Sequence, residues 1–146
     1  MKVFLDTNVL LDMLIASRPD HIYSLQLLKL IKDRKIRGVL TTQSIIDAAY
    51  VQTQRKKVPV QDFKAAMKLI CSLVDVVSIS SDDIDRVNAS SIEDYEDAAQ
   101  VSCALDYGCD IIVSRDSRIS RFTDLEQYAP QKLIERMIAA GNERQF

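Results

Sequence analysis

The sequence feature that most constrains the fold is the N-terminal stretch Val3-Phe-Leu-Asp-Thr-Asn8. Its first three residues are apolar and predict a short buried strand, and the apolar segment 9–15 predicts a helix directly after it. Asp6 therefore stands where a strand passes into a helix, and Thr7 or Asn8 is expected to cap that helix. In open α/β sheets, ligands bind just beyond the carboxyl ends of the strands. The simpler alternative is that these polar residues only turn the chain.

Strand and helix patterns alternate along the whole chain. Further strands are predicted at 38–42, 74–79 and 110–114, and helices at 21–34, 44–53, 60–73, from residue 80, at 92–107 and at 130–140. This order predicts an α/β fold, a three-layer α/β/α sandwich with a mainly parallel central sheet of four to five strands. Because no repeat, linker or low-complexity segment interrupts the pattern, residues 1–146 are expected to form a single domain.

Glycines and apolar spacing predict where helices end and which faces they bury. Gly108 is expected to end the helix 92–107, and Gly141 is expected to end the last helix. In the segment 21–34, apolar residues at helical spacing predict the core face. These residues are Ile22, Leu25, Leu28 and Ile31.

The composition is that of a soluble globular protein and excludes several classes. With 47% hydrophobic and 27% charged residues, 146 residues suffice for a real core. The net charge of −2 excludes bulk positive charge as a source of nucleic-acid affinity, so a nucleic-acid partner would need a local basic patch. The single histidine, His21, follows Pro19 at a loop or helix start, and no cysteine or second histidine lies near it in the sequence. A zinc site is therefore not expected.

Cysteine usage and hydropathy indicate the compartment. Cys71, Cys103 and Cys109 are odd in number and form no CxxC pair, which favours reduced thiols acting as small core residues. No signal peptide is apparent, and the longest apolar runs are far too short to cross a membrane. A cytoplasmic protein with no membrane association is expected.

Acidic residues are predicted to gather at one edge of the sheet. Asp6 and Asp116 follow the first and the last predicted strands, so parallel strands would bring both to the same edge. Asp94 and Asp97 are three residues apart on one helix face, and Asp47 lies one turn into an otherwise apolar helix. Carboxylates are rarely buried unless they are paired or bound to metal. A hard divalent cation, Mg²⁺ or Mn²⁺, would remove their mutual repulsion.

Each of these acids also has an ordinary structural explanation. Asp94 could be a first-turn acid that the helix dipole favours. Asp116 could belong to a turn, and Asp47 could pair with a lysine.

Four stretches of the chain resemble the PIN domain family, the metal-dependent nucleases that include the VapC-type toxins of bacterial toxin–antitoxin pairs. The matching stretches are 3–10, 42–47, 94–99 and 110–116. They keep the family's order along the chain, and the first and last are the most specific. The first is a strand that ends in Asp-Thr-Asn, and the last reads Ile-Val-Ser-Arg-Asp.

The resemblance implies a set of catalytic acids. Asp6, Asp97 and Asp116 match three family acids that hold the metal, and Asp94 matches an additional acid that some members carry. At Asp47 the family usually has a glutamate. Because aspartate is one methylene shorter, this residue is expected to reach the metal only through water.

Polar and basic residues complete the implied site. Asn8 and Ser114 match residues that support the ligating carboxylates by hydrogen bonds. Arg115, Arg118 and Arg121 recur every three residues around the last acid, and they are the predicted contacts to RNA phosphates. The alternative is that these arginines form a solvated face.

The function implied by the resemblance is Mg²⁺- or Mn²⁺-dependent hydrolysis of RNA by an endoribonuclease, acting as the toxin of a type II toxin–antitoxin pair. It would use Asp6, Asp47, Asp97 and Asp116, bind an antitoxin protein and form a homodimer. Two alternatives remain open. One is a PIN-like module that binds RNA or protein without cutting. The other is a Mg²⁺-dependent phosphatase with Asp6 as nucleophile, which usually has a second aspartate where Asn8 stands here.

Overall fold

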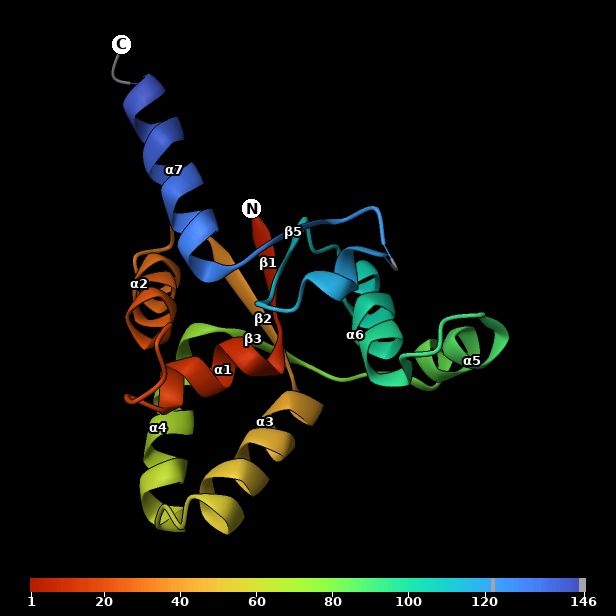
Figure 1. Cartoon of the computed structure of the whole chain (residues 1–146), viewed down its shortest axis with the longest axis horizontal. Helices are drawn as coiled ribbons and strands as arrows, with labels where there is room; N and C mark the ends of the chain where they lie inside the picture. The colour runs from red at the N-terminus through yellow and green to blue at the C-terminus, as the bar shows by residue number, and fades with distance from the viewer. Residues whose placement is uncertain (122, 145–146) are drawn as a thin grey trace.

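The predicted α/β architecture is present in the computed structural model, which describes residues 1–121 and 123–144, without the side chains of residues 120, 121 and 142–144 (Figure 1). All strands pair in parallel in one sheet of order β3-β2-β1-β4-β5. They are β1 (Lys2–Leu5), β2 (Arg37–Thr41), β3 (Asp75–Val77), β4 (Ile111–Val113) and β5 (Glu126–Tyr128). The three-layer sandwich with a parallel sheet of four to five strands is therefore confirmed.

Helices cover both faces of the sheet (Figure 1). They are α1 (Thr7–Leu14), α2 (His21–Lys32), α3 (Thr42–Ala49) with a π-helical continuation (Tyr50–Arg55), α4 (Val60–Leu73), α5 (Ser81–Ala89), α6 (Tyr95–Asp106), a 3₁₀ helix (Ser117–Arg121) and α7 (Pro130–Arg144). One face of the sheet packs against α1, α2, α4 and α7, and the other packs against α6, which α5 covers in turn. Across the part of the chain described here, every helix is too short or too polar to cross a bilayer.

The central strand β1 fixes where the site can form. Val3 and Leu5 are buried on one face of the sheet, and Phe4 is buried on the other. A strand buried on both faces must be apolar throughout, which explains the run of three apolar residues. The register pairs Leu5 with Val113, so Asp6 and Ser114 leave the sheet side by side. The chain crosses to the other side of β1 after β3, which places this edge at a topological switch point where α/β folds bind ligands.

Gly108 ends α6 as predicted, whereas Gly141 does not end the last helix. Gly108 adopts a φ of +67°, and the N–H groups of Gly108 and Cys109 donate to the carbonyls of Leu105 and Ala104 at 3.1 and 3.0 Å. This is the left-handed helix end that glycine favours. Helix α7 continues through Gly141 to Arg144. A glycine in helical conformation weakens a helix without stopping it.

The predicted core face of α2 is confirmed in part. Ile31 is buried and Leu28 packs against the core, as predicted. Ile22 and Leu25 are instead 55% and 38% exposed, and Ser24 and Leu27 are buried. The side chain of His21 at the start of this helix bonds the backbone carbonyl of Asp12, and α2 packs against both α1 and α7. Contacts with α1 and α7 therefore determine which face of α2 is buried, and the spacing of apolar residues within α2 does not predict these contacts.

The two glycines give opposite predictions for the stability of the protein. Gly108→Ala should lower the free energy of unfolding by about 1 kcal/mol because a Cβ is disfavoured at positive φ. Gly141→Ala should raise it by roughly 0.5 kcal/mol because alanine favours a helix interior. Urea unfolding followed by circular dichroism measures both changes. A destabilising Gly141→Ala would contradict the continuation of α7 through this residue.

Candidate active site at the carboxyl edge of the sheet

Asp6 is joined by hydrogen bonds to neighbouring residues at the carboxyl edge of the sheet. It caps α1 itself, in place of the predicted Thr7 or Asn8, because its Oδ1 accepts the backbone N–H of Thr7 at 2.7 Å. Its Oδ2 accepts hydrogen bonds from Asn8 Nδ2 at 3.1 Å and from Ser114 Oγ at 2.7 Å. The residue is only 9% exposed. Burial raises the pKa of Asp6 above its usual value, the hydrogen bonds oppose this, and the nearby charges of Asp116 and Asp94 add to the increase.

Asn8 and Ser114 hold the ends of β1 and β4 together. Besides bonding Asp6, the Asn8 amide donates to Ser114 Oγ at 3.2 Å and accepts the backbone N–H of Arg115, also at 3.2 Å. Ser114 Oγ accepts the backbone N–H of Asp116 at 2.9 Å. The two predicted supporting residues therefore contact both Asp6 and the chain segment that carries Asp116.

The start of α6 brings more carboxylates to the same edge. Asp94 lies just outside the helix as its cap, and its Oδ1 accepts the backbone N–H of Asp97 at 3.1 Å. Burial raises the pKa of Asp97 to about 7, and the negative charges of Asp94, Asp6 and Asp116 contribute. This mutual influence shows that the predicted acids from β1, β4 and α6 lie within electrostatic reach of one another.

Glu96 is an acid of this site that the sequence analysis missed. Burial and the charges of Asp47, Asp6 and Asp94 raise its pKa. Asp47 on α3 is half-buried and accepts a hydrogen bond from Gln43 Nε2 at 3.0 Å. Glu96 is therefore within electrostatic reach of the acid of α3 and of Asp6 and Asp94. The sequence does show a cluster of acids in residues 93–97. Helix spacing, however, places only Asp94 and Asp97 on one face, so it does not indicate Glu96.

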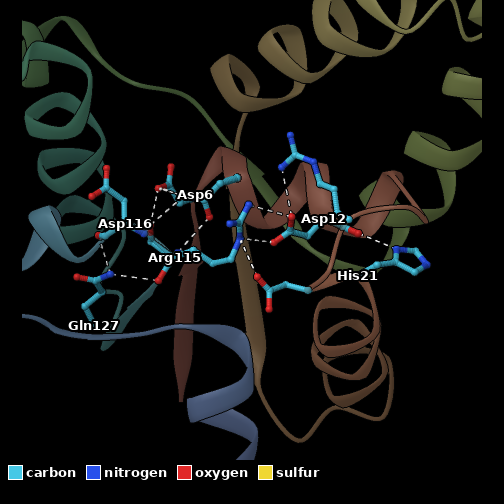
Figure 2. Close-up of polar contacts among 10 residues, drawn as sticks. Asp6, Asp12, His21, Arg115, Asp116 and Gln127 are labelled. Atoms are coloured by element: carbon cyan, nitrogen blue, oxygen red, sulfur yellow. Dashed lines mark hydrogen bonds and ion pairs between the residues drawn. The ribbon is translucent and has the colours of Figure 1, made fainter.

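Two of the predicted phosphate-binding arginines already bind carboxylates. Arg118 forms a two-pronged ion pair with Asp116, with Nε–Oδ1 and Nη2–Oδ2 distances of 2.9 and 2.7 Å. Arg115 points to Asp12 on α1 (Figure 2). The side chain of Arg121 lies outside the described residues. Contact of any of these arginines with RNA remains a prediction.

The acids share one edge of the sheet, but they do not form a metal-binding group in the described residues. Among the described residues, no three Asp, Glu, His or Cys side chains are grouped closely enough to hold one metal ion. The donors are nevertheless hard carboxylate oxygens that repel one another, a set that suits a hard divalent cation better than a soft one. Side-chain rotation, including release of Asp116 from Arg118, would have to bring them together.

The combination of a parallel five-stranded sheet and an acid-lined carboxyl edge defines a PIN-like α/β protein. The structure is similar to the VapC20 toxin of Mycobacterium tuberculosis, described as cleaving the sarcin–ricin loop, with a TM-score of 0.64 and 13% identity over 82% of this chain and 93% of that one. It is also similar to VapBC2 of Rickettsia felis, solved with a fragment of its promoter DNA, with a TM-score of 0.63 and 14% identity over 88% and 98% of the two chains. Likeness at these identities establishes the fold.

The sequence itself settles the family. The PIN domain family model matches residues 2–118, and the chain belongs to the PIN domain family. It is 25% identical to Ribonuclease VapC1 of Aquifex aeolicus (strain VF5) over 142 residues, which cover 92% of this chain and 94% of the relative. The resemblance inferred from the four sequence stretches is therefore confirmed.

The raised pKa values predict that the metal-free protein becomes less stable as pH rises. An acid whose pKa is higher in the folded than in the unfolded state holds more protons when folded, so stability falls between the two values. For Asp97 these values are 3.8 unfolded and about 7 folded, and Asp6 and Glu96 shift in the same direction. Melting in chelator should therefore show Tm falling from about pH 5 to about pH 8.

Asp97→Asn should flatten this dependence, whereas Asp75→Asn, an acid at the opposite edge of the sheet, should leave it unchanged. A wild-type Tm that rises with pH over this range would contradict the described electrostatics.

Proposed function

We propose that this protein is a divalent-metal-dependent endoribonuclease that hydrolyses phosphodiester bonds in RNA. The observation that carries this proposal is the set of carboxylates at one edge of the sheet, where Ser114 bonds both Asp6 and the backbone of Asp116. Burial raises the pKa of Asp97 to about 7, and the charges of Asp94, Asp6 and Asp116 add to the increase. The relation to Ribonuclease VapC1 along nearly the whole chain supports the reaction class.

A Mg²⁺ or Mn²⁺ ion fits this donor set. Asp6, Asp97 and Asp116 would hold the ion, and Asp94 is the additional candidate ligand. When bound, such an ion lowers the pKa of water and neutralises charge that develops on phosphate oxygens. Burial raises the pKa values of Asp6 and Asp97, and repulsion between the acids adds to the increase. A cation offsets that repulsion, so metal binding and deprotonation of these acids favour each other.

The chain's own residues would orient the reaction. Asn8 and Ser114 hold the Asp6 carboxylate in one orientation through bonds of 3.1 and 2.7 Å. Asp97 would either bind the ion directly or orient the attacking water by accepting a hydrogen bond from it. Glu96 is a candidate for the longer carboxylate that the family resemblance implies at position 47, because the charge of Asp47 contributes, after burial, to its raised pKa.

The substrate must be guided to this acidic edge by local positive charge, because the net charge is −2. Arg118 is the strongest candidate phosphate contact. Its side chain is 65% exposed and adjoins Asp116, so release from that carboxylate would leave it beside the scissile phosphate. Arg121 is a further candidate from the sequence.

We extend the proposal to a toxin role with a protein partner. The Rickettsia felis structure is of a VapBC2 pair on promoter DNA, and the relative from Aquifex aeolicus also carries a VapC name. By this relation we propose that the protein acts as the toxin of a type II pair, forms a homodimer in the cytoplasm and is held inactive by an antitoxin. A small reading frame beside the gene would favour this role over general RNA turnover.

The competing proposal is a PIN module that binds RNA or protein without cutting. Its supporting observation is Asp47, which is shorter than the usual glutamate and whose Oδ1 is already bonded to Gln43. The two proposals differ in metal-dependent cleavage, which only the nuclease would show.

Cleavage of a single-stranded RNA in Mn²⁺ or Mg²⁺ provides the test. Asp6→Asn and Asp116→Asn should each lower kcat/KM by more than the roughly 10- to 100-fold that loss of an outer-shell partner causes. The matched control Asp75→Asn should retain activity, and chelator should abolish it. Cleavage that persists in chelator, or in the Asp6→Asn, Asp116→Asn double variant, would reject the proposed site.

A further inference from the structure

We infer that Asp12 and Arg115 form a positioning pair that fixes the segment 114–116 in the active site. Arg115 is then a positioning residue and not a phosphate ligand. The inferred effect on metal binding rests on the proposed function, whereas the geometry of the pair is independent of it.

Asp12 is a fully buried carboxylate within the otherwise apolar segment 9–15. It lies one turn after Asn8 on α1, and none of its side chain is exposed. Its Oδ2 accepts Arg115 Nε at 2.6 Å and its Oδ1 accepts Arg115 Nη2 at 3.1 Å (Figure 2). Such a two-pronged pair is both strong and geometrically specific, so it fixes the plane of the guanidinium as well as its position.

The connection between α1 and α2 surrounds this pair. Arg18 Nη1 donates to Asp12 Oδ1 at 3.2 Å, and a ring nitrogen of His21 lies 2.7 Å from the Asp12 carbonyl oxygen. Asp20 Oδ2 lies 3.5 Å from Arg115 Nε. A buried carboxylate of this kind is strongly destabilising when its partner is lost, and it can serve to specify one arrangement of the chain.

Arg115 stands in the middle of the segment that the pair would position. Ser114 on one side bonds Asp6, and Asp116 on the other side is a proposed metal ligand. From β5, Gln127 Nε2 donates to the carbonyls of Ser114 at 3.1 Å and of Asp116 at 2.7 Å (Figure 2). The segment is thus clamped between α1 and β5. Partners of this type control the affinity of the ligands they orient.

Arg115 and Arg118 differ in how readily they could leave their carboxylate partners. The side chain of Arg115 is 36% exposed and its charge is matched by a buried carboxylate, so moving it to RNA would leave Asp12 without its main partner. The side chain of Arg118 is 65% exposed and its partner is an acid of the site itself. Of these two residues, only Arg118 can move to a phosphate without uncovering a buried charge.

The experiment compares Asp12→Asn, Arg115→Met and Arg115→Lys with the matched control Asp83→Asn. Asp83 is also a buried carboxylate with an arginine partner, Arg86, but it joins α5 to α6 on the far side of α6. All variants should melt at lower temperature than the wild type. Mn²⁺ affinity, measured by calorimetry well below the melting range, should fall about 10- to 100-fold in Asp12→Asn and Arg115→Met.

Further readouts separate positioning from general stability. Arg115→Lys keeps the charge with fewer bonds, so its loss of affinity should be smaller than that of Arg115→Met. Asp83→Asn should keep wild-type Mn²⁺ affinity. In cleavage assays, the loss in Asp12→Asn should appear in kcat at saturating RNA. Hydrogen exchange of a peptide spanning 111–117 should become faster in Asp12→Asn but not in Asp83→Asn.

Two outcomes would overturn the inference. Unchanged Mn²⁺ affinity in Asp12→Asn, with a higher KM for RNA as the only effect of Arg115→Met, would make Arg115 a phosphate ligand. Unchanged exchange of 111–117 in Asp12→Asn would show that the pair does not fix the segment. If the wild type binds no Mn²⁺, the proposed function fails, and the exchange measurement still decides the positioning role.

Discussion

Repulsion among carboxylates at the carboxyl edge of the sheet is the constraint on which the rest of this structure depends. Asp6 lies buried at the end of the central strand. Burial raises the pKa of Asp6 and of Asp97, and the negative charges of Asp94 and Asp116 add to both increases. Like charges gather in a fold only when other interactions hold them there. The short apolar strand β1 and its parallel pairing with β4 provide that restraint, since they fix Asp6 and Ser114 side by side.

Polar contacts around the acids maintain the arrangement at a cost in stability. Asn8 and Ser114 satisfy Asp6, Gln127 holds the backbone on both sides of Arg115, and the buried Asp12 anchors that arginine. The crowding of carboxylates lowers the stability of the folded protein, and packing elsewhere in the fold compensates for it, as is common at functional sites. A divalent cation would relieve the repulsion and stabilise the folded state further.

The sequence predicts those parts of the site that depend on local pattern. The strand end at Asp6, the late strand before Ser114 and the glycine that ends α6 follow from apolar runs and turn chemistry. Glu96 and Asp12 do not, because their roles depend on how α6 is rotated and on a partner 103 residues away, Arg115. Strand β5 has only three residues, all polar or aromatic, and it carries no strand pattern. The buried face of α2 depends on α1 and α7, which its own spacing does not reveal.

A crystal structure of the protein soaked in Mn²⁺, with anomalous diffraction data, tests the central claim most directly. The account predicts an anomalous peak bounded by the carboxylates of Asp6, Asp97 and Asp116, with Arg118 displaced from Asp116 and Arg115 still bound to Asp12. A fully occupied Mn²⁺ site elsewhere, or no peak at this edge at millimolar Mn²⁺ with the acids ionised, would contradict it.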